Sequence, residues 1–134
     1  MNFPEIKIGE SITIQKKVTE TETVANYGTG QVDNLLSTAS LVALMQEASA
    51  QLLDAKLPEG FITVTQMVQV FHEKPSHIGS FITVIVEVTA FDGNKIQLSM
   101  TALDDYGSIG YGSHNRAIVN KLSMLKKMNT RDMD

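Results

Sequence analysis

The alternation of hydrophobic and polar positions predicts one enclosed helix. Residues 36–49 read LSTASLVALMQEAS and carry a single charge, Glu47, whereas a helix on a protein surface normally has a wide polar face. Leucine, methionine and alanine recur there at helical spacing, and small side chains fill much of the remaining surface. The pattern predicts a helix that begins at Ser37 or Thr38 and ends near Ala55. Because small side chains allow other backbones to approach closely, we expect this helix to be surrounded by a sheet.

Strands are predicted on both sides of this helix. Before it, ESITIQKKVTETE alternates from Ile12 to Val18; after it come FITVTQMVQVFHEK, SFITVIVEVTAF, KIQLSMTAL and SIGYGSHNRAIVN, which are joined by short turns. Short connections favour antiparallel pairing. The prediction is therefore an α+β domain in which a five-stranded antiparallel sheet wraps one long central helix, the arrangement called the hotdog fold. Sheets of this kind commonly pair across a dimer.

Length and composition indicate one domain over residues 1–134, with an ordered core over about 10–120 and a polar tail over 121–134 that is either a frayed helix or disordered. The net charge is −4 without a long basic run, which argues against nucleic acid as a partner. Cysteine is absent, so disulfides and thiol chemistry are excluded. The N-terminus lacks a secretory pattern, and no apolar run is long enough to span a membrane. We expect a cytoplasmic protein that has no membrane partner.

The sequence contains neither a complete dinucleotide-binding motif nor a set of metal ligands at a typical spacing. Gly28 and Gly30 lie in VANYGTGQVDN, but the third glycine of a dinucleotide-binding motif would fall on Asp33. A connection over the mouth of a site is the favoured interpretation of that loop. The three histidines have no close metal-ligand spacing and no cysteine accompanies them, so no metal site is predicted.

The strand FITVTQMVQVFHEK places a histidine at its end. Alternation predicts that Ile62, Val64, Val68 and Val70 share one face, with His72 at the end of the same face. By itself this histidine is either a general base, whose ordinary pKa lies near the operating pH, or a hydrogen-bonded structural residue.

Other polar residues have equally open interpretations. Thr38 either caps the helix or supplies a reactive hydroxyl. His114 and Arg116 share one strand face, and a cross-strand polar pair accounts for them. The seven methionines are typical of core filling.

Four segments, LLSTASLVALMQEAS, VQVFHEKPSHIG, VEVTAFDGNKIQLSMTALDD and IGYGSHNRAIV, together resemble the hotdog-fold thioesterases related to the fluoroacetyl-CoA-specific thioesterase. The resemblance runs from about Gly30 to Val119. The family pattern has a threonine that opens the helix, a glutamate eight residues later, a histidine that ends a strand before a proline-containing turn, and a late His-x-Arg. It implies that Thr38 and His72 are catalytic residues.

The sequence departs from that pattern twice. The family's glutamate falls on Gln46, and a family glycine that lines the acyl pocket falls on Thr65, where a larger side chain narrows the pocket or adds a hydroxyl. Glutamine accepts no proton at neutral pH, although it still orients water or a carbonyl group by hydrogen bonds. The resemblance also makes Arg116 a candidate contact for substrate or CoA.

The function implied is hydrolysis of a short acyl-CoA thioester, with His72 as base, Thr38 as hydroxyl and Gln46 as a positioning residue. Acyl-CoA is the substrate and no further cofactor is implied. The pocket would form at the interface of a homodimer, or of a dimer of dimers. The alternative is a protein that binds acyl-CoA with little or no catalysis, because position 46 lacks a carboxylate. A hydratase is less favoured, since it needs a histidine paired with an acid that we do not find.

Overall fold

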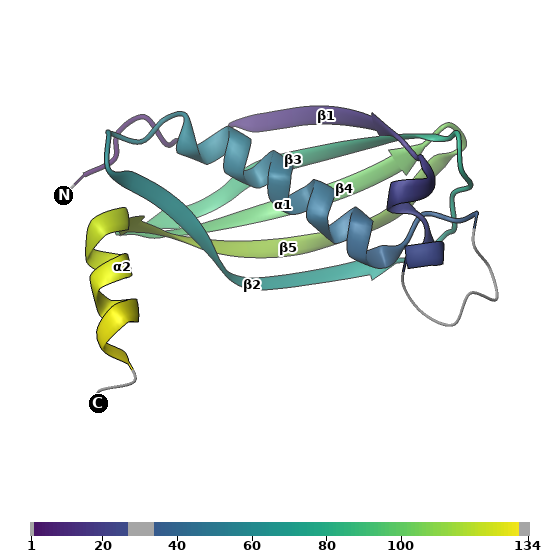
Figure 1. Cartoon of the computed structure of the whole chain (residues 1–134). Helices are drawn as coiled ribbons and strands as arrows, with labels where there is room; N and C mark the ends of the chain where they lie inside the picture. The colour runs from purple at the N-terminus through teal and green to yellow at the C-terminus, as the bar shows by residue number, and fades with distance from the viewer. Residues whose placement is uncertain (1, 27–33, 132–134) are drawn as a thin grey trace.

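The computed structural model describes residues 2–26 and 34–131. In chain order the elements are β1 (Ser11–Lys17), the 3-10 helices η1 (Glu20–Glu22) and η2 (Val24–Asn26), α1 (Thr38–Asp54), β2 (Phe61–His72), β3 (Phe81–Asp92), β4 (Lys95–Asp104), β5 (Gly107–Asn120) and α2 (Lys121–Thr130). The strands form one sheet in the order β1-β3-β4-β5-β2, and every neighbouring pair is antiparallel (Figure 1). The predicted fold class is confirmed.

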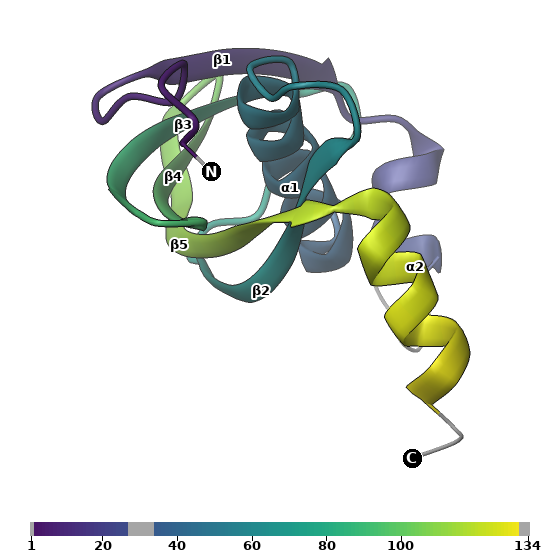
Figure 2. The ribbon, with the colours of Figure 1, turned by 90° about the vertical axis from the view of Figure 1, so that its left-hand side faces the viewer.

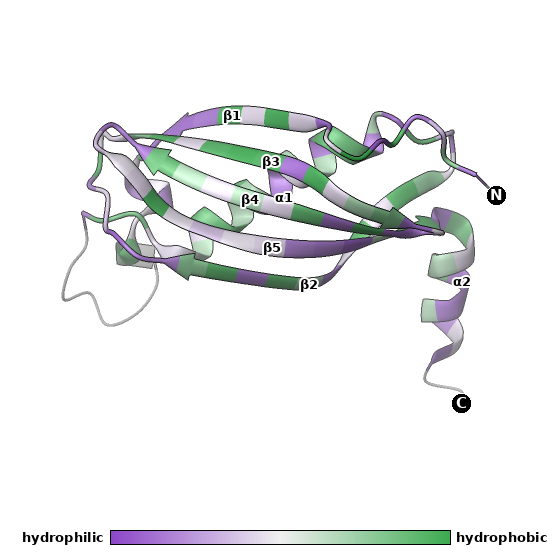
Figure 3. Ribbon diagram, turned by 180° about the vertical axis from the view of Figure 1, so that it is seen from behind, coloured by the Kyte–Doolittle hydropathy of each residue, from purple (hydrophilic) through white to green (hydrophobic). Residues whose placement is uncertain are grey.

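The sheet curls around α1, as the view along the helix shows (Figure 2). Ser37 caps the helix, because its hydroxyl accepts a hydrogen bond from the backbone N–H of Ser40 at 3.0 Å. Hydrophobic and polar residues alternate along β3 and β4 (Figure 3), and their inward residues pack against the helix. The enclosed face of α1 carries a set of buried side chains: Leu41, Leu44, Met45, Ala48, Ser49, Leu52 and Leu53. Burial of this kind is the main stabilising contribution to such a domain.

A β-bulge in β2 changes which residues face the helix. The pairing of β2 with β5 shifts between Thr65 and Met67, so one extra residue occupies the strand and the inward side changes from odd to even positions. Thr63 is consequently buried on the helix side, where its hydroxyl donates to Asp54 of α1 at 2.7 Å. The prediction that Ile62 and Val64 share a face with the later valines and His72 is therefore wrong before the bulge.

The β2 strand lies close to β5 near its C-terminal end. A Cβ atom added at Gly112 would overlap the carbonyl oxygen of Gln69, and one at Gly110 would overlap that of Phe71. Only glycine permits this approach. The two glycines thus help to position the end of β2 that carries His72.

Residues 121–130, for which the sequence left a frayed helix or disorder open, form α2. Asn120 caps it by accepting from the N–H of Ser123 at 3.0 Å. The helix has no buried residue and projects from the body of the domain beyond β2 (Figures 1 and 2). Neither helix has the length and apolar content that crossing a bilayer requires, over the described residues.

Candidate functional site

Two of the predicted catalytic residues meet at one end of the fold. Thr38 is the first residue of α1 and His72 is the last residue of β2. The hydroxyl Oγ1 of Thr38 lies 2.7 Å from Nδ1 of His72, which is hydrogen-bonding distance. Either group is the donor, depending on the tautomer of the imidazole. A hydroxyl hydrogen-bonded to a histidine is the arrangement that general-base activation requires.

The surroundings of His72 favour the neutral ring. Burial lowers the pKa of His72. The nearby backbone of Lys74 acts in the opposite direction and raises the pKa by a smaller amount, although no well-aligned hydrogen bond joins that backbone to the ring. The second ring nitrogen, Nε2, is buried and has no hydrogen-bonding partner among the described residues. A neutral imidazole near neutral pH is the form that accepts a proton.

A hollow and a helix terminus adjoin this pair. The hollow has a volume of about 220 Å³ and is lined by Val24, Leu35, Leu36, His72, Glu73, Lys74 and Pro75. The N-terminus of α1 begins at Thr38 itself, and the first N–H groups of a helix lack intrahelical acceptors and carry partial positive charge. These donors suit a developing oxyanion. The glycines at 28 and 30, predicted to lie over a site, fall outside the described residues.

Gln46 does not join Thr38 and His72 within one chain. It lies eight residues after Thr38 on α1, which corresponds to about 12 Å along the helix axis. Its side chain is half-buried and makes no hydrogen bond to either residue in the part of the chain that is described. The structure therefore brings together two members of the predicted set and separates the third.

A second group of polar side chains lies under the middle and C-terminal half of α1. Ser49 donates its hydroxyl hydrogen to the carbonyl oxygen of Met45 at 2.8 Å, so it accepts from Nδ1 of His114 at 3.1 Å. The other ring nitrogen, Nε2, then accepts from the hydroxyl of Thr65 at 2.9 Å. This directional chain assigns His114 as a neutral imidazole with its hydrogen on Nδ1. His114 is fully buried, and burial followed by the nearby charge of Arg116 lowers its pKa to about 4.

Arg116 is fixed within the same group. Its Nη1 donates to the Thr65 hydroxyl at 2.9 Å, and its Nε and Nη2 donate to the hydroxyl and carbonyl of Thr63, each at 2.8 Å. The Thr63 hydroxyl in turn donates to Asp54. Burial lowers the pKa of Arg116, while the charge of Asp54 opposes that shift. Arg116 and His114 are thus joined through Thr65 rather than as a direct cross-strand pair.

Thr65 and Arg116 lie apart from the Thr38–His72 pair in a single chain. Thr65 is seven positions before His72 on β2, which is about 20 Å of strand. Three members of this second group, Ser49, Asp54 and Thr63, were not predicted. Ser49 had a detectable signal, since it is a polar residue on an otherwise apolar face of the helix.

Substitution of Thr65 by valine is expected to lower the free energy of unfolding by about 2 kcal/mol. Valine has nearly the same shape but leaves Nε2 of His114 and Nη1 of Arg116 without their shared partner. Thr65→Ser retains the hydroxyl and is the matched control, with an expected loss below about 1 kcal/mol. Urea denaturation measures both. Equal losses in the two variants would contradict the hydrogen-bond assignment.

Comparisons with known proteins place this geometry in a family. The sequence model of the fluoroacetyl-CoA-specific thioesterase family, FlK, matches residues 18–122. The crystal structure of a hot-dog-like protein from Thermanaerovibrio acidaminovorans has 31% identity and a TM-score of 0.91, covering 98% of this chain and 97% of that one. A structure of the fluoroacetyl-CoA thioesterase FlK has 22% identity and a TM-score of 0.86, covering 93% and 96%.

A hypothetical protein of Thermus thermophilus described as a thioesterase superfamily member has 22% identity and a TM-score of 0.84, covering 94% of this chain and 95% of that one. A comparison with curated protein sequences gives no significant match. The match to the family model extends over most of the chain and includes Thr38, His72 and Arg116. The chain therefore belongs to the FlK family of hotdog-fold thioesterases.

Proposed function

We propose that this protein hydrolyses a short acyl-CoA thioester, with Thr38 and His72 as the reacting pair. The observation that carries the proposal is the 2.7 Å contact between the Thr38 hydroxyl and Nδ1 of a histidine whose pKa is lowered. Solved FlK structures include one with fluoroacetate and CoA, and one with acetyl-CoA. These support a CoA thioester as substrate class. The reaction needs no cofactor, and a cytoplasmic location is part of the same proposal.

The chemistry follows from the geometry of the pair. Nδ1 of His72 accepts the proton of the Thr38 hydroxyl, or of a water molecule that this hydroxyl holds, as the oxygen attacks the thioester carbonyl. Backbone N–H groups at the start of α1 stabilise the negative charge on the carbonyl oxygen. The C–S bond then breaks, and the protonated imidazole returns its proton to the departing CoA thiolate. Where water is the attacking oxygen, this step releases the free acid. Where Thr38 attacks, the acyl group is left as an ester on its hydroxyl oxygen, and a water molecule deprotonated by the same imidazole then hydrolyses that ester and restores the hydroxyl.

The proposed unit is a homodimer that forms along β2, either alone or within a dimer of dimers. This strand is one edge of the sheet, is twelve residues long, and exposes Met67 and Phe71. A long exposed hydrophobic edge is a surface that natural proteins cover. Two-fold pairing runs the two β2 strands antiparallel, which turns the His72 end of one chain toward the Thr65 half of the other. The partner's Gln46 and Thr65 would then belong to the site.

A screen for thiol release over acyl-CoA chain length tests the proposed function. We expect release above the buffer rate for short acyl chains, because the hollow beside His72 is small. No release from any member of the panel, with a folded protein, would contradict hydrolysis. Calorimetry on the same panel then distinguishes the second candidate, an acyl-CoA binding protein, which the neutral side chain at position 46 favours.

Replacement of Gln46 by glutamate is expected to increase the rate of thiol release at least tenfold. The carboxylate would restore a proton acceptor where the family has one, and general-base assistance is typically worth about 10²–10⁴-fold. Gln51→Glu adds the same charge at an exposed position of the same helix and should leave the rate unchanged. Equal rates for Gln46→Glu and Gln51→Glu would show that position 46 takes no part in the reaction.

A further inference from the structure

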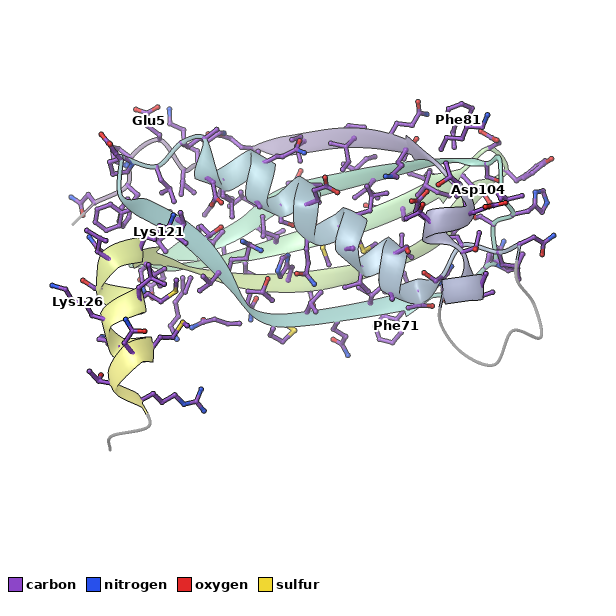
Figure 4. The ribbon with its side chains drawn as sticks, viewed as in Figure 1. Glu5, Phe71, Phe81, Asp104, Lys121 and Lys126 are labelled. Atoms are coloured by element: carbon purple, nitrogen blue, oxygen red, sulfur yellow. The ribbon has the colours of Figure 1, made fainter. Side chains whose placement is uncertain are left out.

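The C-terminal helix α2 has a charge opposite to that of the rest of the protein. Residues 121–131 contain four cations and no acidic side chain. Because the whole chain has a net charge of −4, the remainder carries −8. Lys126 is directed outward from the helix in Figure 4. A helix of this composition is attracted to an acidic surface.

The same helix exposes large apolar side chains. Leu122 is 70% exposed, Met128 61% and Leu125 38%. A groove of about 560 Å³ separates α2 from the end of β5, and it is lined by Val119, Asn120, Ser123, Met124, Lys127, Met128 and Arg131. A cluster of exposed leucine and methionine beside an open groove is typical of a contact surface.

The position of α2 indicates what covers it. The helix follows the strand end where Asn120 pairs with Phe61, so it lies at the end of β2 opposite to His72. It extends past the free edge of β2, the side on which Phe71 is exposed (Figures 1 and 4). An antiparallel second copy on that edge reverses the order of the ends. The α2 helix of one chain then lies beside the His72 end of the other.

We infer that α2 docks on the His72 end of a second copy of this chain and forms one wall of its Thr38–His72 site. This inference rests on the dimer proposed above. The receiving end offers the helix an acidic group beside Lys74, together with apolar residues. Glu73 follows His72 directly, is exposed, and has no side-chain partner among the described residues. Phe71 and Pro75 flank it in the sequence and are exposed and apolar, which suits the leucine and methionine side chains of α2 and leaves the hollow itself to the substrate.

Docking in this position has a consequence for the site. Thr38 is exposed in the single chain, so the hydrogen bond to His72 is open to water. A helix from the partner excludes water from one side of that pair, which strengthens electrostatic interactions with the substrate. Each site is then incomplete without the other copy.

Cross-linking between unlike chains tests the inference, because the protein has no cysteine of its own. One chain carries Met128→Cys and a differently tagged chain carries Glu73→Cys; the two are mixed and treated with a short bismaleimide. We expect the covalent product to consist mainly of one chain of each kind, at least fivefold above the product with Ile8→Cys in place of Glu73→Cys. Ile8 is 66% exposed and precedes β1, the opposite edge of the sheet. Leu125→Cys with Lys74→Cys provides a second pair, about one turn earlier on the same face of the helix.

The outcomes separate this inference from the proposals on which it rests. A dimer in sedimentation that gives no product above the Ile8 control with either pair overturns the docking of α2 and leaves the dimer. A monomer at all concentrations overturns both. Binding of the protein to vesicles of anionic phospholipid, abolished by Lys127→Glu and without cross-linking, overturns the inference and assigns α2 to a lipid surface. A specific cross-link without thioester hydrolysis supports the inference and contradicts only the proposed reaction.

Discussion

Replacement of His72 by alanine is expected to lower kcat/KM for thiol release at least a hundredfold. The imidazole is the only ring within hydrogen-bonding distance of the Thr38 hydroxyl among the described residues. A positioned general base contributes about 10²–10⁴-fold, so its removal should eliminate most of the rate enhancement. The measurement is thiol release from the best acyl-CoA of the chain-length panel, at substrate concentrations below and above KM.

Matched variants separate a chemical role from a structural one. His77→Ala removes an exposed ring five residues later and should leave kcat/KM unchanged. Thr38→Val removes the hydroxyl with little change of shape, whereas Thr38→Ser retains it; the valine variant should lose far more activity than the serine variant. If His72→Ala kept more than a third of the wild-type kcat/KM in a folded protein, the assignment of the base would be wrong.

The pH profile provides an independent check on the same residue. Burial lowers the pKa of His72, so its ring remains neutral at pH values where an ordinary histidine is protonated. We expect kcat/KM to fall on acidification with a midpoint below the ordinary histidine pKa of 6.5. A midpoint at or above pH 6.5 would contradict a lowered pKa.

The sequence pattern predicted those features of the protein that depend on residues close together in the chain, but not the contacts between distant residues. Alternation along each strand and the helical spacing around Leu41 are local signals, and they were sufficient for the fold. The meeting of Thr38 with His72 is not local, because 34 residues separate them. It was predicted from family resemblance. Strand alternation by itself left His72 equally consistent with a structural role.

The errors have identifiable physical causes. The bulge near Gln66 reverses the inward face of β2, and no proline, glycine or turn residue marks it in the sequence. Within one chain Gln46 lies apart from Thr38 and His72 because of the helical rise of about 12 Å between positions 38 and 46, and its part in a site shared by two chains stays a prediction. The contact of Thr65 with His114 depends on the register between β2 and β5, which periodicity does not specify.

Acidification below pH 6.5 is expected to destabilise the protein through the buried ring of His114. The ring is fully buried, and its pKa is lowered from 6.5 to about 4 in the folded protein. As the pH falls through 6.5, His114 binds a proton in the unfolded chain but not in the folded chain. The free energy of unfolding therefore decreases. The stability is complete above pH 6.5 and decreases down to about pH 4, by about 3 kcal/mol for this single group.

Comparison with a variant isolates this contribution from that of carboxylates, which titrate in part of the same range. His114→Gln has no titratable group and can still hydrogen-bond to Ser49 or Thr65. Its free energy of unfolding, measured by urea denaturation at each pH, should therefore fall less steeply between pH 6.5 and 4 than that of the wild type. His77→Gln is the control, since His77 is exposed and its removal should leave the wild-type slope. Parallel slopes for wild type and His114→Gln would show that His114 is protonated in the folded protein, and the directional chain from Arg116 to Ser49 would then require a different proton assignment.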